Sequence, residues 1–124
     1  MKPMVEVTKE EAIAECQQRI EIYTKNAEKL AMLDRLVLNP DFIALIEEDY
    51  FKARPVRLVM AKGNPSMDSA DSQARLVREM DGIAMLRQYF HVIETEGTVA
   101  KAMIERELDQ IKELELEVEG DYHE

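Results

Sequence analysis

The two histidines, His91 and His123, are the side chains best suited to bind a transition metal, but their neighbours do not complete a site. A di-iron helical bundle uses two Glu-x-x-His pairs. Three residues before these histidines the chain has Gln88 and Gly120 in place of glutamate. His91 and Glu94 would share one helix face, and a single pair supplies too few ligands. We therefore expect no metal and no cofactor.

The other reactive residue types also lack a catalytic arrangement. Cys16 is the only cysteine, so no internal disulfide can form. It lies in an apolar stripe, where a small buried hydrophobe fits better than a reactive thiol. The Gly63-Asn64-Pro65 turn lacks the glycines and lysine of a phosphate-binding loop. The 26 carboxylates are too numerous for any pair to indicate acid–base chemistry. The sequence predicts a protein that is not an enzyme and takes no small-molecule substrate.

Charge is unevenly distributed along the chain. The formal net charge is −10, and residues 66–124 carry 6 basic and 15 acidic residues, a net of −9. This balance disfavours binding to nucleic acid or to an anionic membrane. Four basic residues flank Pro55 and are candidates for contact with an anion or a partner: Lys52, Arg54, Arg57 and Lys62. Alternatively, they balance nearby carboxylates or meet the acidic tail, residues 113–124, of a neighbouring subunit.

Length and composition indicate a single all-α domain. The chain has 124 residues, of which 46% are hydrophobic and 34% charged, and it has no tryptophan. The N-terminus lacks the apolar run of a signal peptide, and no stretch reaches the ~18 apolar residues that would span a membrane. One buried free thiol is consistent with a reducing compartment. We expect a soluble, cytoplasmic protein.

Apolar spacing and capping residues predict three helices. The first covers residues 9–38, begins at the Thr8 to Glu11 capping box and carries an apolar stripe at 3/4 spacing. The second covers residues 41–62, begins after the Asn39 cap and is expected to kink at Pro55. The third covers residues 68–117. Gly97 could break it or could let another backbone approach closely. The stripe of the first helix consists of Ile13, Cys16, Ile20, Tyr23, Ala27 and Leu30.

The third helix carries one heptad register from Leu76 to Val118, which is typical of a coiled coil. At ~1.5 Å per residue it would be ~65 Å long, whereas a compact domain of this size has a radius of gyration of ~14 Å. We therefore expect a partner, most simply a second copy, to cover its far end. Glu79 and Glu107 occupy d positions, where the seam should open or pair them with Arg or Lys. The predicted partner seam consists of Leu76, Ile83, Leu86, Phe90, Ile93, Ala100, Ile104, Ile111, Leu114 and Val118.

Two other expectations concern local structure. The aromatic pairs Tyr50-Phe51 and Tyr89-Phe90 are expected to meet across the bundle. Both ends of the chain, residues 4–7 and 114–119, also alternate with period two, which is a strand pattern. Short terminal strands are therefore an alternative to helix at these ends.

Three segments resemble a known group of proteins. Residues 49–59 (DYFKARPVRLV), 64–67 (NPSM) and 85–90 (MLRQYF) are similar to small helical proteins encoded in the structural-gene regions of tailed bacteriophages. The resemblance covers roughly residues 38–95 and rests on packing and turn residues. It implies an assembly factor or minor virion component, located in the host cytoplasm or the virion, and it supplies no catalytic residues.

Three hypotheses follow from the sequence. The leading one is a non-enzymatic helical oligomer that acts in phage head or tail assembly, binding itself and other virion or host proteins. The second is an acidic inhibitor or adaptor that mimics nucleic acid and binds a basic host protein. The third is a small packaging-type DNA-binding oligomer, which the scarcity of basic residues disfavours.

Overall fold

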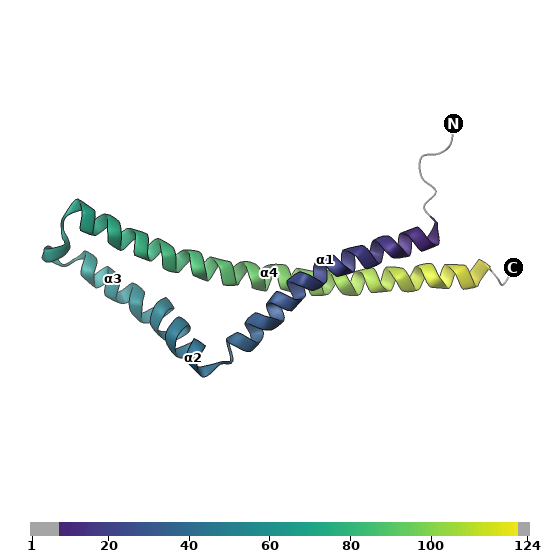
Figure 1. The fold of residues 1–124 in the computed structure, drawn as a ribbon, viewed down its shortest axis with the longest axis horizontal. Coiled ribbons are helices and arrows are strands. Elements are labelled where there is room, and N and C mark those ends of the chain that lie inside the picture. The colour runs from purple at the N-terminus through teal and green to yellow at the C-terminus, as the bar shows by residue number, and fades with distance from the viewer. Residues whose placement is uncertain (1–7, 122–124) are drawn as a thin grey trace, which may run out of the picture. The chain divides into compact units, whose positions relative to one another are not determined.

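The computed structural model describes residues 8–121 of the chain, with side chains described for residues 8–117. These residues form helices and turns and no strand, which confirms the all-α prediction. The elements in chain order are α1 (Lys9–Leu36), α2 (Pro40–Phe42), the π-helix η1 (Ile43–Ala53), α3 (Arg54–Lys62), the 3₁₀-helix η2 (Pro65–Met67) and α4 (Ala70–Asp121) (Figure 1).

Helix α1 begins as its capping residues predict and ends two residues earlier than expected. The amide of Glu11 donates to Thr8 Oγ1 at 3.1 Å, so one half of the predicted capping box is formed. At the other end Asn39 is extended, with φ −76° and ψ 124°. The following proline disfavours helical geometry at this residue, and the chain leaves the helix before reaching it.

The second predicted helix is present as three consecutive helical segments, α2, η1 and α3. The Asn39 cap is confirmed, because its Oδ1 accepts hydrogen bonds from the amides of Asp41 and Phe42 at 2.9 and 3.3 Å. We expected a kink at Pro55, but the irregular part is the eleven-residue π-helix that precedes it. In an α-helix the proline ring would meet the carbonyl four residues earlier. In a π-helix the backbone hydrogen bonds run five residues back, and the Arg54 amide accordingly donates to the Asp49 carbonyl. This wider hydrogen-bond pattern changes the position of the carbonyl that the proline ring would otherwise meet.

Helix α4 is continuous over 52 residues, so Gly97 does not break it. The amide of Ser72 donates to Ser69 Oγ at 3.1 Å, which caps the start two residues later than predicted. The helix continues four residues beyond the predicted end. The strand alternative for residues 114–119 is therefore wrong, because these residues are helical. The other strand-like segment, residues 4–7, lies outside the described residues.

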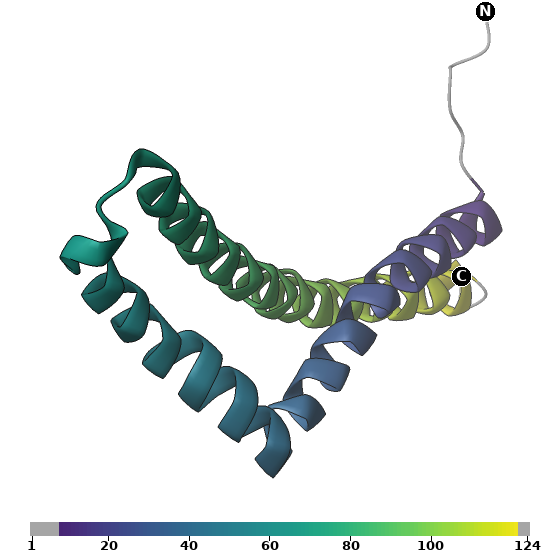
Figure 2. The ribbon, with the colours of Figure 1, turned by 60° about the vertical axis from the view of Figure 1, so that its left-hand side comes forward.

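The described chain packs as two units. The first consists of residues 8–30 and 95–121, and within it α1 lies along the C-terminal part of α4. The second is Ala31–Glu94, within which α3 lies along the N-terminal part of α4 (Figure 2). We expected another copy to cover the far end of the long helix. In the structure residues 9–30 of α1 in the same chain pack there.

Candidate interaction site

The predicted seam of α4 is the face by which this helix packs against the rest of its own chain. Leu76, Ile83 and Ala100 are buried. The other seam positions with described side chains are half-buried: Leu86, Phe90, Ile93, Ile104, Ile111 and Leu114. The side chain of Val118 lies outside the described residues. The heptad register thus locates the packing face, while a role of this seam between copies stays a prediction.

In the second unit the seam meets α3 and η1. Leu58 of α3 forms a buried cluster with Leu76 and Ile83, and several half-buried residues pack on this cluster: Tyr50, Phe51, Ala61, Met67 and Met80. The expected aromatic contact is formed by Phe51 and Phe90, whose ring centroids are 6.0 Å apart in an edge-to-face arrangement. Tyr89 is instead largely exposed. Residues of the segment 41–62 therefore pack on the N-terminal half of α4.

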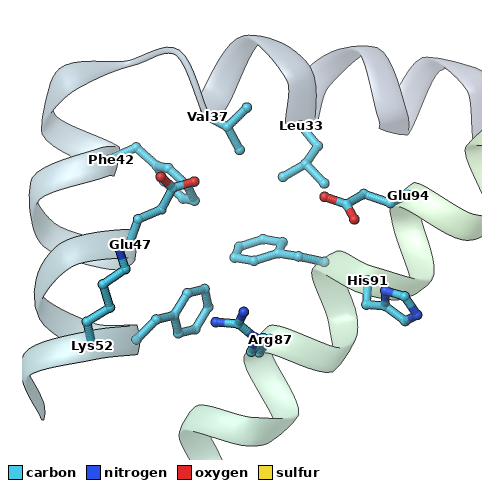
Figure 3. Close-up of a pocket in the computed structure, with 10 residues that line it drawn as sticks. Leu33, Val37, Phe42, Glu47, Lys52, Arg87, His91 and Glu94 are labelled. Carbon is cyan, nitrogen blue, oxygen red and sulfur yellow. The ribbon is translucent and has the colours of Figure 1, made fainter. Parts of the chain in front are cut away.

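A cavity of about 310 Å³ opens beside these aromatic rings (Figure 3). Half of its ten lining residues are apolar, and the other half are charged or polar, with charges of both signs. The guanidinium carbon of Arg87 lies 5.6 Å from the centroid of the Phe51 ring, which is a cation–π contact. The lining of the cavity consists of Leu33, Val37, Phe42, Glu47, Phe51, Lys52, Arg87, Phe90, His91 and Glu94.

His91 and Cys16 lie in different surroundings: His91 is exposed and lines the cavity, whereas Cys16 is buried. Within residues 8–121 the structure brings together no group of three His, Cys, Asp or Glu side chains that could hold a metal ion. Cys16 is 1% exposed, and burial raises the pKa of its thiol, with the Glu107 carboxylate adding to the effect. A buried thiol with a raised pKa stays protonated and is a poor nucleophile.

In the first unit Glu107 provides the one charged seam position of α4 that is buried among the described side chains, at 8% exposure. Arg19 of α1 binds it through two hydrogen bonds: Nε donates to Oε1 at 2.8 Å and Nη2 donates to Oε2 at 3.1 Å. Nη2 also lies 3.4 Å from the Cys16 sulfur. Mainly because of these hydrogen bonds, the pKa of Glu107 is lowered and that of Arg19 is raised. Both groups are therefore charged at neutral pH.

Gly97 allows α1 to approach α4 closely. A Cβ built at this position would overlap Leu30 Cβ and lie 2.8 Å from Leu30 Cδ2. Leu30 and Ala100 are buried at the same contact. Of the two alternatives for Gly97, the structure shows the close approach and not the break: the helix continues through Gly97, and Leu30 of α1 packs directly against it.

The four basic residues around Pro55 do not form a free anion site. Lys52 pairs with Glu48 at 3.3 Å, and Arg57 pairs with Asp49 at 2.9 Å. Arg54 pairs with Glu79 of α4 at 3.4 Å, so at the second charged d position the structure shows pairing with a basic residue, one of the two alternatives given for it. Lys62 has no ion pair among the described residues. Most of the cluster thus balances carboxylates of its own unit.

Arg19 is the residue that sequence reasoning missed. Arg19 follows Cys16 by three residues and so shares its helix side, which was the available signal that it could reach a buried carboxylate. It could not be paired with a position on α4 before the crossing of the two helices was known.

Comparisons of the chain with protein-family models, curated proteins and solved structures found no match. Among the described residues, no helix combines the length and apolar character required to cross a membrane.

The contact at Gly97 can be tested with a matched pair of glycine variants. Gly97→Ala should lower the free energy of unfolding by about 1–3 kcal/mol, because the added methyl group overlaps Leu30. Gly82→Ala in the same helix should raise it by about 0.5–1 kcal/mol, since a Cβ there meets only Tyr50 Oη at 3.9 Å. Urea unfolding followed by circular dichroism measures both changes. Equal stabilisation by the two alanines would contradict the close contact.

The Arg19–Glu107 pair should make stability depend on pH. The folded-state pKa of Glu107 lies below its ordinary value of 4.5. Its stabilising contribution is therefore complete above that value and is lost as pH falls through the lowered folded pKa. The Tm of wild type should exceed that of Glu107→Gln by a constant amount from about pH 8 to about pH 5.5, and the difference should shrink below about pH 4.5. A Tm difference that does not change down to about pH 2 would contradict this assignment.

Proposed function

We propose that this chain is a non-enzymatic helical subunit of a larger assembly, and that the assembly is a phage head or tail. The observation that supports the proposal is the number of large apolar side chains that the described residues leave exposed. Among the described side chains, fifteen large hydrophobic residues are exposed and seven hydrophobic residues are buried. Apolar residues that gather on one side of a helix, as Val56, Val59 and Met60 do on α3, are typical of protein–protein contacts.

Two further features support a role in assembly. The described residues hold no metal-binding group, and their single thiol is buried and protonated. The charged seam positions of α4 are neutralised within the chain by Arg19 and Arg54, so the helices can be held in place before any partner binds. The resemblance of residues 38–95 to proteins encoded in phage structural-gene regions is the reason for proposing a phage assembly in particular.

A second function is favoured by one specific surface. Asp109, Glu113, Glu115 and Glu117 are exposed at the end of α4, and no basic residue occupies its last turn. An acidic adaptor that binds a basic protein would use such a surface. The DNA-binding alternative has less support, because three of the four candidate basic residues are already ion-paired.

The proposal predicts that the purified chain self-associates. Light scattering on a size-exclusion column should give a mass that is a multiple of 14.3 kDa. Mass spectrometry of purified virions, or of head and tail intermediates, from the phage that encodes the chain should detect it in a fixed ratio to a structural protein. A monomer that is missing from virions and from all intermediates would contradict the proposal. A monomer that binds one basic host protein would support the adaptor instead.

A further inference from the structure

The π-helix η1 is an unusual element, because eleven consecutive residues share its hydrogen-bond pattern. In most proteins π geometry is confined to a single turn inside an α-helix, frequently at a functional site. The segment contains no glycine and no proline, and Ala, Leu, Glu and Lys within it are good α-helix formers. Nothing in its own sequence therefore excludes an α-helix, and the cause of the π pattern lies in its neighbours.

Pro55 is the first of these neighbours. It occupies one of the first two positions of α3, directly after η1. If η1 were an α-helix, the proline ring would meet the carbonyl of Phe51, four residues earlier. The last hydrogen bond of η1 instead runs from the Arg54 amide to the Asp49 carbonyl. Pro55 therefore favours the π pattern in the turn that precedes it.

The aromatic ring of Phe90 on α4 is the second neighbour. Phe42 lies just before η1 and Phe51 lies near its end, yet both rings contact Phe90 edge-to-face, with centroid distances of 5.8 and 6.0 Å. Nine residues of an α-helix make about two and a half turns, which would place these two side chains on opposite sides. A π-helix has more residues in each turn, and it brings both rings to the side that faces α4.

The cavity beside these rings depends on the same pattern. Three of its lining residues, Phe42, Glu47 and Lys52, follow one another at intervals of five, which is the hydrogen-bond interval of a π-helix. Figure 3 shows their side chains one above another along one helix. Residues five apart on an α-helix would differ in direction by about 140°. In an α-helix these three side chains would therefore no longer line one cavity.

Both ends of η1 join regular helix without a break. The flanking residues have right-handed helical dihedral angles, with φ −63° and ψ −44° at Phe42 and φ −66° and ψ −43° at Arg54. An exchange of five-residue for four-residue hydrogen bonds would therefore leave the whole segment helical. Such an exchange turns the side chains of η1 relative to α4.

We propose that η1 is a switch between two registers: a π register in which the cavity exists, and an α register in which the cavity is absent. Pro55 and the two ring contacts with Phe90 favour the π register. In the α register at most one of the two rings keeps its contact. The outer surface of η1 changes together with the cavity, so a partner that binds one form would shift the population towards it. This conformational device does not depend on the proposed assembly function.

The variant Pro55→Ala of the full chain tests the switch, because it removes the ring that favours the π register. Scalar couplings across hydrogen bonds, measured by NMR, identify the acceptor of the Arg54 amide. In wild type the acceptor should be the Asp49 carbonyl. In the variant it should become the Tyr50 carbonyl, and one of the two nuclear Overhauser effects to the Phe90 ring should be lost. A variant that keeps the Asp49 acceptor and both ring contacts would overturn the proposal.

Pro40→Ala is the matched control. Pro40 starts α2, and the extended residue Asn39 precedes it, so its ring meets no helical turn. This variant should keep the Asp49 acceptor and both contacts with Phe90. Conversion of this control to the α register would count against the role of Pro55. Circular dichroism should show the same helix content in both variants, which separates a change of register from unfolding.

The wild-type chain provides the second test. Shifts of helix register occur on the microsecond-to-millisecond timescale, which NMR relaxation dispersion detects. Dispersion should be concentrated in the amides of residues 43–54, and the chemical shifts of the minor state should match those of Pro55→Ala. Flat dispersion profiles across this segment would overturn the switch, even if the variant adopts the α register.

Discussion

The contact between α1 and α4 is the constraint on which the first packing unit depends. Gly97 removes the side chain that would hold the two helices apart, and Leu30 occupies the space. The approach places Arg19 against Glu107, so a carboxylate that would be costly to bury alone receives two charge-assisted hydrogen bonds. Close packing and charge pairing therefore select the same alignment of the helices, and Cys16 and Ala100 are buried as a result.

Covering the seam within the chain changes where partners can bind. A helix of 52 residues presents a stripe too long for one neighbouring helix, and this chain covers it in two parts, with α1 on one and α3 with η1 on the other. Each part is only two helices deep, so the outer faces of α1, α3 and α4 keep apolar residues in water. The exposed apolar residues of α4 thus lie outside the heptad seam. They are part of the physical basis of the assembly proposal.

The parts of this fold that sequence could predict depend on local spacing. The heptad register identifies the packing face of α4 because helical periodicity alone determines which residues share a side. The Thr8 and Asn39 caps follow from their side-chain chemistry. The π-helix before Pro55 had no comparable local signal. The Arg19–Glu107 pair joins residues 88 positions apart, and its formation depends on how two helices cross. The sequence predicts that Glu107, if buried, needs a basic side chain as its partner, but it does not identify Arg19 as that residue.

The most direct test of the account is whether Leu30 and Gly97 touch within one chain. A small fraction of ¹³C-labelled protein diluted into unlabelled protein leaves contacts between two labelled residues observable only when both belong to the same molecule. The account predicts a nuclear Overhauser effect between the Leu30 methyl groups and the Gly97 α-protons that survives this dilution. An effect that appears only between labelled and unlabelled copies, or no effect at all, would contradict it.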